Sequence, residues 1–319
     1  MQTRCHLSIL IHEQAKKYGA REAISFQHFG SEVWKTVSWN QFSLRVKQVS
    51  NAFLNLGLKP QEKIAVFSQN CIQYLYTDFG AYGVRAVSIP FYATSSEQQI
   101  QYMINDAQVR FIFVGEQEQY DKAHRSCPLC PGLQRIVIFN PSVRMSTNDP
   151  HALYFTDFIA LDEKLPRPSE VEALWQQASM DDVCNILYTS GTTGQSKGVV
   201  LTYRQYHAAL EANGRCVDVT EKDRVINFLP FTHIFERGWA YLALSKGAQL
   251  IINTYPKEIQ ESMRETHPTS MSSVPRFWEK VYQAVKDRMD NASPLQRRIF
   301  NNALKIGRKR NVEYLGRGK

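Results

Sequence analysis

The sequence predicts an α/β protein in which mostly parallel strands alternate with helices. Short runs rich in valine, isoleucine and phenylalanine are apolar on both faces, as expected of parallel strands that helices cover on both sides. Between these runs lie segments with helical spacing of apolar residues and with capping residues at their ends. The chain has 319 residues, 43% of them hydrophobic, which suffices for one large domain or two smaller ones.

The first predicted helix begins after Ser38, which forms a capping box with Gln41, and ends at Gly57. Its apolar residues recur at steps of four, three, four and three, at Phe42, Val46, Val49, Phe53 and Leu56. Pro90 is expected to end the second strand. In this half of the chain we expect strands at 64–67, 87–89, 109–114 and 136–139, and further helices at 71–82 and 96–107.

The second half of the chain follows a connector at about 140–171 that is rich in Pro, Ser, Asp and Thr. We therefore expect a first subdomain with its connector at 1–180 and the start of a second at 181–319. In the second we expect strands at 183–188, 198–201, 225–229, 249–252 and 270–274, and helices at 203–213, 235–245, 256–265, 276–289 and 294–309.

The segment most informative about function is Tyr188-Thr-Ser-Gly-Thr-Thr-Gly-Gln-Ser-Lys-Gly198, a loop of glycines and hydroxyl residues with one lysine between two predicted strands. Glycines permit a tight turn, and backbone N–H groups, hydroxyls and Lys197 suit a polyphosphate. It is not a Walker A loop, because the glycine spacing differs and the loop leads into a strand rather than a helix. A flexible surface hairpin is the alternative interpretation.

A second candidate segment is Phe228-Leu-Pro-Phe-Thr-His-Ile-Phe-Glu-Arg-Gly238, in which His233 falls where a strand passes into a helix. Ligands of α/β proteins bind at such junctions. Taken alone, however, His233 is better interpreted as a hydrogen-bonded packing histidine.

The remaining composition points to a reduced, cytoplasmic protein. No apolar run is long enough for a membrane span or a signal peptide. The pair Cys127-Pro-Leu-Cys130 has no partner pair, so reduced thiols are favoured over a zinc site. The net charge is +8, and the excess lies late in the chain. We interpret this excess as a solvated helix face, while attraction to nucleic acid, an anionic membrane or the phosphates of coenzyme A stays open.

Taken together, these segments resemble the adenylate-forming superfamily of acyl-CoA synthetases, luciferases and peptide-synthetase adenylation domains. The loop is similar to the family's phosphate-binding signature, although the usual proline is Ser196 here. His233, thirty-six residues after Lys197, matches the second signature. The run Phe235-Glu-Arg-Gly238 and the segment Val274-Pro-Arg276 resemble the long-chain fatty acid–CoA ligase branch.

The resemblance implies two stacked sheet-and-helix subdomains, the second incomplete and followed by no C-terminal domain, since the family's later motifs do not occur. It therefore identifies the chain as an N-terminal portion of such a ligase, inactive alone, from a truncated gene or an excised piece. The implied reaction joins a fatty acid to CoA through acyl-AMP, with ATP, Mg²⁺ and CoA taking part. Small molecules rather than nucleic acid are the expected partners, with peripheral membrane contact and oligomeric state left open.

The resemblance also implies the site residues. Lys197 and His233 would act in catalysis, and Thr189 would reach Mg²⁺. The phosphates would lie against Thr189, Ser190, Gly191, Thr192, Thr193, Gly194 and Lys197. His233 would border the acyl carboxylate, lined by Phe231, Phe235 and Trp239, and Arg237 stands at the offset of an aromatic gate. A non-catalytic nucleotide- or acyl-binding remnant, or another acyl or aryl adenylate-forming enzyme, are the alternatives.

Overall fold

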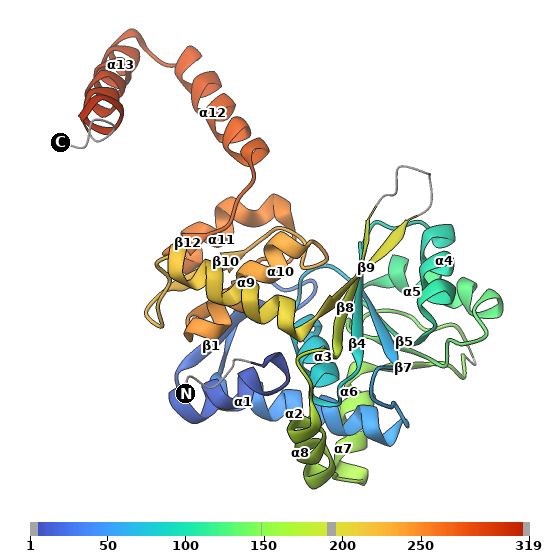
Figure 1. Ribbon diagram of the computed structural model, residues 1–319. Coiled ribbons are helices and arrows are strands. Elements are labelled where there is room, and N and C mark those ends of the chain that lie inside the picture. Colours follow the sequence, from blue (N-terminus) through green and yellow to red (C-terminus); the bar gives the residue numbers. More distant parts are fainter. Residues whose placement is uncertain (1–5, 148, 190–195, 315–319) are drawn as a thin grey trace. The chain divides into compact units, whose positions relative to one another are not determined.

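The computed structural model describes residues 6–147, 149–189 and 196–314. The chain falls into two compact units, Met1–Ser272 and Ser273–Lys319. The first unit contains both sheets (Figure 1).

The larger sheet has seven strands in the order β7-β6-β5-β3-β4-β8-β9. Its neighbours are parallel except β8 and β9, which form an antiparallel pair. The strands are β3 (Lys63–Phe67), β4 (Val87–Phe91), β5 (Val109–Val114), β6 (Arg135–Ile138), β7 (Ala152–Tyr154), β8 (Val183–Thr189) and β9 (Lys197–Thr202).

The smaller sheet has five strands in the order β12-β10-β11-β1-β2, with β1 and β2 antiparallel and the others parallel. The strands are β1 (Glu22–Gln27), β2 (Trp34–Ser38), β10 (Arg224–Asn227), β11 (Gln249–Ile252) and β12 (Ser270–Met271). The α/β class is thus confirmed.

Helices α2 and α3 form a layer that both sheets share. They pack on each other, while α2 also contacts β1 and β2, and α3 contacts β3 and β4. Helices α4 and α5 contact strands of the larger sheet and cover its other face. The helices of this unit are α1 (Leu7–Tyr18), α2 (Trp39–Asn55), α3 (Ile72–Gly83), α4 (Glu97–Ala107), α5 (Gln117–Ser126), α6 (Phe155–Ile159), α7 (Leu161–Lys164), α8 (Pro168–Gln177), α9 (Tyr203–Cys216), α10 (Ile234–Lys246) and α11 (Ile259–Thr266).

The expected boundary at residue 180 does not separate the sheets. Strands β8 and β9, assigned to the second subdomain, extend the larger sheet, where Asn185 pairs with Ser88 of β4. Strands β1 and β2, assigned to the first, complete the smaller sheet, where Ile24 pairs with Leu250. The pattern of apolar residues identifies strands but carries no information on which strands become neighbours.

Some predicted element bounds also change. Pro90 does not end β4, which continues to Phe91 and places Pro90 opposite Val66 of β3. The strand tolerates the proline because β4 pairs with β8 at Ser88 alone among the described residues, so a ladder hydrogen bond toward β8 is not needed at position 90. The expected connector at 140–171 contains β7, α6, α7 and the beginning of α8.

Other predicted elements end elsewhere, among them β12, which ends at Met271 rather than at residue 274. Helix α9 passes Gly214 and ends at Cys216. Strand β10 ends at Asn227 rather than at residue 229, because the Phe228 N–H donates to the Glu236 carboxylate instead of to a neighbouring strand.

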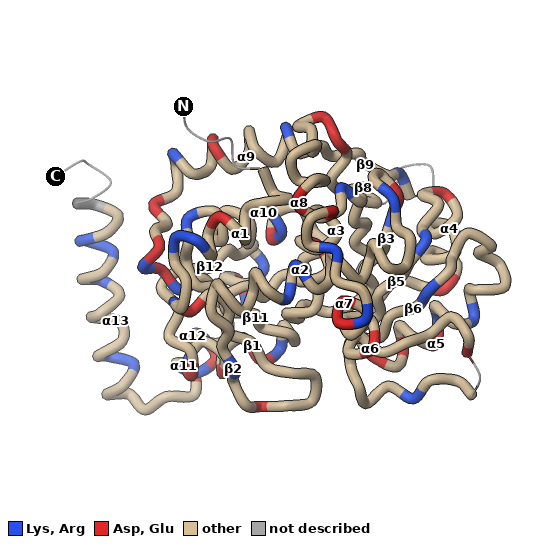
Figure 2. The backbone as a smooth tube through the Cα atoms, turned by 90° about the horizontal axis from the view of Figure 1, so that it is seen from below, with Lys and Arg blue, Asp and Glu red and all other residues tan. Residues whose placement is uncertain are grey.

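The second unit consists of α12 (Pro275–Asp290), α13 (Pro294–Arg308) and a short π-helical stretch, Lys309–Tyr314. Both α-helices are amphipathic, and their apolar residues Trp278, Val281, Tyr282, Val285, Leu295, Ile299, Leu304 and Ile306 are exposed. The charged residues of α13 are all basic (Figure 2). Within the described residues, no helix combines the length and apolar composition needed to cross a bilayer.

Candidate functional site

The candidate phosphate loop begins and ends in one antiparallel hairpin. Strand β8 ends at Thr189 and strand β9 begins at Lys197, and these two residues are register partners. The predicted order of strand, loop, strand and helix is present in β8, β9 and α9. Ser190, Gly191, Thr192, Thr193 and Gly194, which we also expect to contact phosphate, lie outside the described residues.

Side-chain contacts hold the base of this hairpin against α4. The Tyr188 hydroxyl donates to Asp106 Oδ2 at 2.5 Å, and its ring meets Tyr102 edge-on at 6.4 Å between centroids. Burial raises the pKa of Tyr188, so its hydroxyl keeps its proton and remains a donor. On the partner strand, a Cβ at Gly198 would lie 2.8 Å from Ile186 Cγ2, so the close packing of the two strands requires glycine there.

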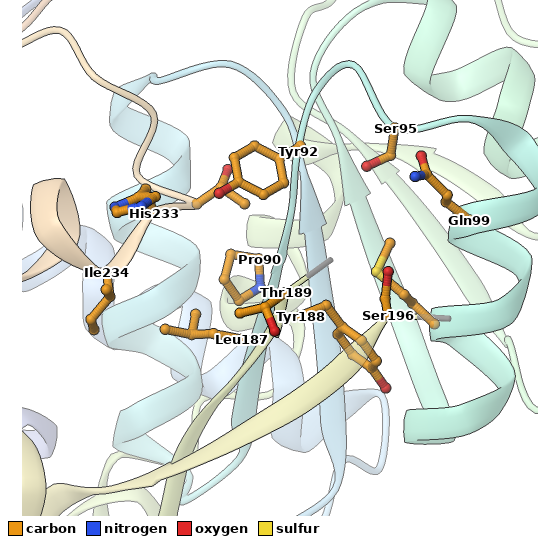
Figure 3. A pocket seen from close by; sticks show the side chains of 12 residues that line it. Pro90, Tyr92, Ser95, Gln99, Leu187, Tyr188, Thr189, Ser196, His233 and Ile234 are labelled. Carbon is orange, nitrogen blue, oxygen red and sulfur yellow. The ribbon is translucent and has the colours of Figure 1, made fainter. Parts of the chain in front are cut away.

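A pocket of about 530 Å³ opens beside the hairpin (Figure 3). Three segments that are distant in sequence line it: the end of β4 with the beginning of α4, the hairpin, and the beginning of α10. In Figure 3, His233 and Ile234 lie on the side opposite Ser95 and Gln99, with Thr189 between them. The structure therefore brings Thr189, Ser196 and His233 to one pocket. Lys197 is exposed at the start of β9.

His233 is the N-cap of α10. Its ring Nδ1 accepts a hydrogen bond from the Phe235 N–H at 3.2 Å, which satisfies one of the free donors at the helix end. Because Nδ1 accepts, the neutral ring carries its proton on Nε2. The exposed His233 side chain thus presents an N–H donor suited to an anionic oxygen.

The residues predicted to line the acyl site do not line this pocket. Phe231 is buried in the core and Phe235 is 49% exposed. Neither of them, nor Trp239, is among the described residues that line this pocket. Arg237, at the offset of an aromatic gate, is 1% exposed and pairs with Asp78 in the interior.

The wall formed by Pro90, Tyr92, Ser95, Gln99 and Met103 was not predicted. The capping box of Ser96 and Gln99 correctly marks the beginning of α4. Nothing in the sequence indicates, however, that this end of α4 faces the hairpin.

Glu236, next to Arg237 in α10, is fully buried. Its Oε1 accepts from Asn227 Nδ2 at 2.7 Å and from the Phe228 N–H at 3.1 Å, and its Oε2 accepts from the Ser272 hydroxyl. Burial raises its pKa to about 7, against the opposing effect of these donors. Glu236 therefore ties the end of β10 to α10 and to the segment that follows β12.

The part of the chain that the structure describes contains no group of three or more His, Cys, Asp or Glu side chains that could hold a metal ion. Cys130 is buried and Cys127 half-buried beside a short 3₁₀ turn, and both are free thiols. A Mg²⁺ ion that arrives with a nucleotide takes most of its ligands from phosphate and water. The Thr189 hydroxyl at the pocket is a candidate oxygen ligand for such an ion.

Curated relatives resemble nearly the whole chain. The long-chain-fatty-acid–CoA ligase ACSBG1 of Rattus norvegicus is 24% identical over 313 residues, which cover 95% of this chain and 42% of the ligase. Fatty acyl-CoA synthetase A of Dictyostelium discoideum is 28% identical over 306 residues, covering 91% of this chain and 44% of the synthetase. The chain thus spans less than half the length of these relatives.

Solved structures share the fold. The adenylation domain of a carboxylate reductase from Mycobacterium chelonae superposes with a TM-score of 0.78 at 20% identity, covering 96% of this chain and 52% of that domain. The anthranilate CoA ligase AuaEII, in complex with anthranoyl-AMP, gives a TM-score of 0.71 at 20% identity, covering 83% of this chain and 49% of the ligase. The AMP-binding enzyme family matches residues 11–308, and the chain therefore belongs to that family.

Proposed function

We propose that this chain forms the phosphate- and carboxylate-facing part of an ATP-dependent ligase that joins long-chain fatty acids to CoA. The observation that carries the proposal is the pocket in which the β8–β9 hairpin meets the beginning of α10. Hydroxyls of Thr189 and Ser196 and the exposed ring of His233 share this pocket, and Lys197 is paired with Thr189 in register.

The proposed reaction has two steps. A carboxylate oxygen of the fatty acid attacks the α-phosphorus of ATP, and the bond from that phosphorus to pyrophosphate breaks, which gives acyl-AMP. The sulfur of CoA then attacks the acyl carbon, AMP leaves, and the thiol proton passes to solvent. Catalysis of such transfers consists largely of positioning and charge neutralisation, which side chains and backbone amides supply.

The hairpin would hold the β- and γ-phosphates. Lys197 contributes the positive charge, and the loop it closes contributes amides and hydroxyls, including those of Ser190, Thr192 and Thr193. Each charge-assisted hydrogen bond of this kind contributes about 1.5–3 kcal/mol. Bound Mg²⁺ would neutralise phosphate charge and would meet the chain at Thr189.

His233 would donate its Nε2–H to the acyl carboxylate. As N-cap, the ring is fixed at the end of α10 by the Phe235 N–H, so the donor is oriented before the substrate arrives.

The choice of a long-chain fatty acid is supported by the segments Phe235–Gly238 and Val274–Arg276 and by the names of the curated relatives. An aryl acid is the competing substrate class, since a structural neighbour is an anthranilate ligase. Pyrophosphate release with hexadecanoate and with benzoate, measured on a polypeptide that contains this chain, distinguishes the two.

Calorimetric titration of the chain with ATP and Mg²⁺ tests the phosphate site directly. We expect Lys197→Ala to weaken ATP binding at least tenfold, which corresponds to about 1.4 kcal/mol. Lys35→Ala, at an exposed lysine of β2 in the other sheet, is the matched control and should bind ATP normally. Equal affinity of wild type and Lys197→Ala would remove the hairpin from the proposal. ATP binding without acyl-AMP formation in any polypeptide containing the chain would favour a non-catalytic binding module.

A further inference from the structure

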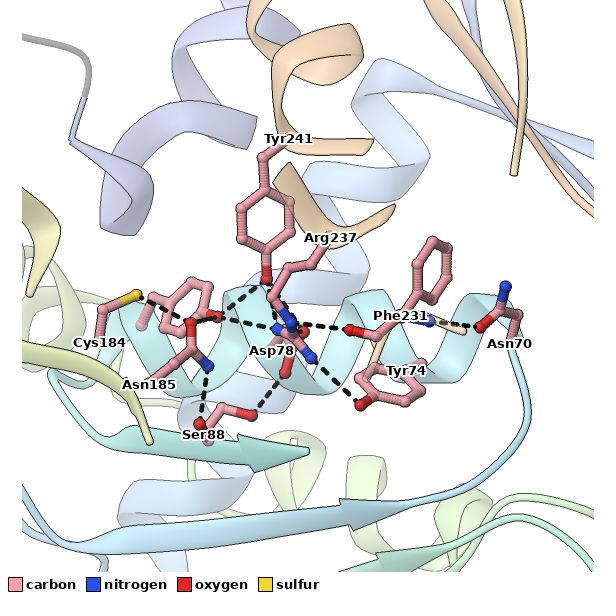
Figure 4. A network of polar contacts seen from close by, with 10 residues as sticks. Asn70, Tyr74, Asp78, Ser88, Cys184, Asn185, Phe231, Arg237 and Tyr241 are labelled. Atoms are coloured by element: carbon pink, nitrogen blue, oxygen red, sulfur yellow. Dashed lines mark hydrogen bonds and ion pairs between the residues drawn. The ribbon is translucent and has the colours of Figure 1, made fainter. Parts of the chain in front are cut away.

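A buried ion pair joins helix α3 to helix α10 (Figure 4). Arg237 Nη1 of α10 lies 2.5 Å from Asp78 Oδ2 of α3, and both side chains are 1% exposed. Removing two charges from water is unfavourable, and apolar residues of similar volume often stabilise a core as well. Stability alone therefore does not account for this pair.

Hydroxyl groups bind both members of the pair. Arg237 Nη1 also donates to the Tyr241 hydroxyl at 2.8 Å, and Nη2 donates to the Tyr74 hydroxyl at 3.1 Å. Asp78 accepts from the Ser88 hydroxyl at 2.6 Å and from Tyr241 at 3.0 Å. The guanidinium is thus fixed in position and direction by α3, α10 and, through Ser88, the larger sheet.

Another Arg237 donor leaves this network and reaches the main chain. Its Nε–H donates to the Phe231 carbonyl at 2.9 Å. Asn70 holds the same turn from the other side: its Oδ1 accepts from the Phe231 N–H at 2.9 Å, and its Nδ2 donates to the Leu229 carbonyl at 2.8 Å. These side chains fix the backbone two residues before His233, whose own N–H donates to the Pro230 carbonyl at 2.9 Å.

We propose that Arg237 and Asp78 are positioning residues for His233. Asp78 fixes the guanidinium, the guanidinium and Asn70 fix the turn at 229–231, and the turn sets where the His233 ring stands at the pocket. This inference rests on the proposed function, in which His233 binds the carboxylate of the substrate. Arg237 stands at the offset of the family's aromatic gate. In this chain it would instead fix the position of His233, which binds the carboxylate.

The test compares two Arg→Lys variants of the chain. Arg237→Lys keeps a positive charge beside Asp78, but an ammonium group cannot also reach the Phe231 carbonyl through a separate N–H as the guanidinium does. Arg85→Lys is the matched control: Arg85 also pairs with an aspartate, Asp182, through two hydrogen bonds of 2.8 and 3.2 Å, and donates no hydrogen bond to the turn at 229–231. The readouts are the NMR signal of the His233 ring, assigned with His233→Asn, and the affinities for hexadecanoate and ATP.

We expect Arg237→Lys to move the His233 ring signal and to weaken hexadecanoate binding at least fivefold, with ATP affinity changed less than twofold. Arg85→Lys should leave all three unchanged. An unmoved His233 signal in Arg237→Lys, or an equal change in Arg85→Lys, would overturn the proposal.

A second variant covers the case in which Arg237→Lys does not fold. Asn70→Ala removes two hydrogen bonds to the turn and leaves the ion pair intact, and it should give the same selective change. If the wild-type chain binds neither hexadecanoate nor ATP, the proposed function fails, while the ring signal still decides whether these residues position His233.

Discussion

Glu236 makes the stability of the first unit depend on pH. Among the described residues, the hydrogen bonds to this buried carboxylate come from neutral groups, including those of Asn227, Phe228 and Ser272. Burial raises its pKa from 4.5 to about 7, so the folded protein binds this proton more tightly than the unfolded chain does. Below pH 4.5 the carboxyl is protonated in both states, and Glu236 does not lower the free energy of unfolding. As the pH rises from 4.5 to about 7, the free energy of unfolding falls because of this group, and above about 7 this decrease levels off.

Replacing Glu236 by glutamine removes this dependence and keeps the contacts. The amide oxygen can still accept from Asn227 and Phe228, and the amide nitrogen can donate to the Ser272 hydroxyl. One pKa unit corresponds to about 1.4 kcal/mol, so ionisation of Glu236 costs the fold about 3 kcal/mol at pH 8. Between pH 5 and pH 8, the stability of Glu236→Gln relative to wild type should therefore rise by about 2.5 kcal/mol.

Urea unfolding of both proteins at pH 5, 6, 7 and 8 measures this difference in free energy of unfolding. The contributions of the other titrating groups are the same in both proteins and therefore cancel. Glu32→Gln, at an exposed carboxylate, reports the effect of removing a surface charge. The reasoning predicts that the free energy of unfolding of Glu236→Gln, minus that of wild type, increases with pH. If this difference stays constant or decreases as the pH rises, the raised pKa of the buried Glu236 carboxyl is refuted.

Two further predictions concern packing and capping. A Cβ at Gly80 would lie 2.3 Å from Val49 Cγ1, so Gly80→Ala should destabilise the packing of α2 on α3 by about 1–3 kcal/mol, as measured by urea unfolding. The control is Gly238→Ala: a Cβ at this helical glycine would meet no atom within 4 Å, so this variant should be more stable than wild type by up to about 1 kcal/mol. A Gly80→Ala protein as stable as wild type would contradict the close approach of α2 and α3 at Gly80. His233→Asn keeps a side-chain acceptor at the N-cap and His233→Ala does not, so the alanine variant should be less stable by about 1 kcal/mol, while both lose affinity for the fatty acid. Equal stability of the two would show that the ring does not cap α10.

Helix beginnings were largely predictable because capping is local. The boxes Ser38 with Gln41, Ser96 with Gln99, and Thr202 with Gln205 all form in the structure. Side chains three residues apart determine them, and no distant contact is needed.

Sheet neighbours were not predictable because they depend on contacts between distant parts of the chain. Strand β1 pairs with β11, more than two hundred residues later, and no pattern within either strand specifies the other. The same limit applies to the site. The hairpin was predicted from its own residues, whereas the wall contributed by Tyr92, Ser95 and Gln99 depends on the position of α4.

Arg237 illustrates the limit most clearly. It stands at the offset of the family's aromatic gate, yet the side chain lies in the core against Asp78, 159 residues earlier. A buried arginine requires a partner, and the sequence does not indicate which of the chain's acidic residues supplies it.

The central claim is that the hairpin around Lys197 holds the polyphosphate of ATP. A crystal structure of a polypeptide containing this chain, with a non-hydrolysable ATP analogue and Mg²⁺, tests it most directly. We predict β- and γ-phosphate oxygens within hydrogen-bond distance of Lys197 Nζ and of the segment between Thr189 and Lys197. Density for the triphosphate at any other place on the chain, with this segment free of phosphate, would contradict the claim.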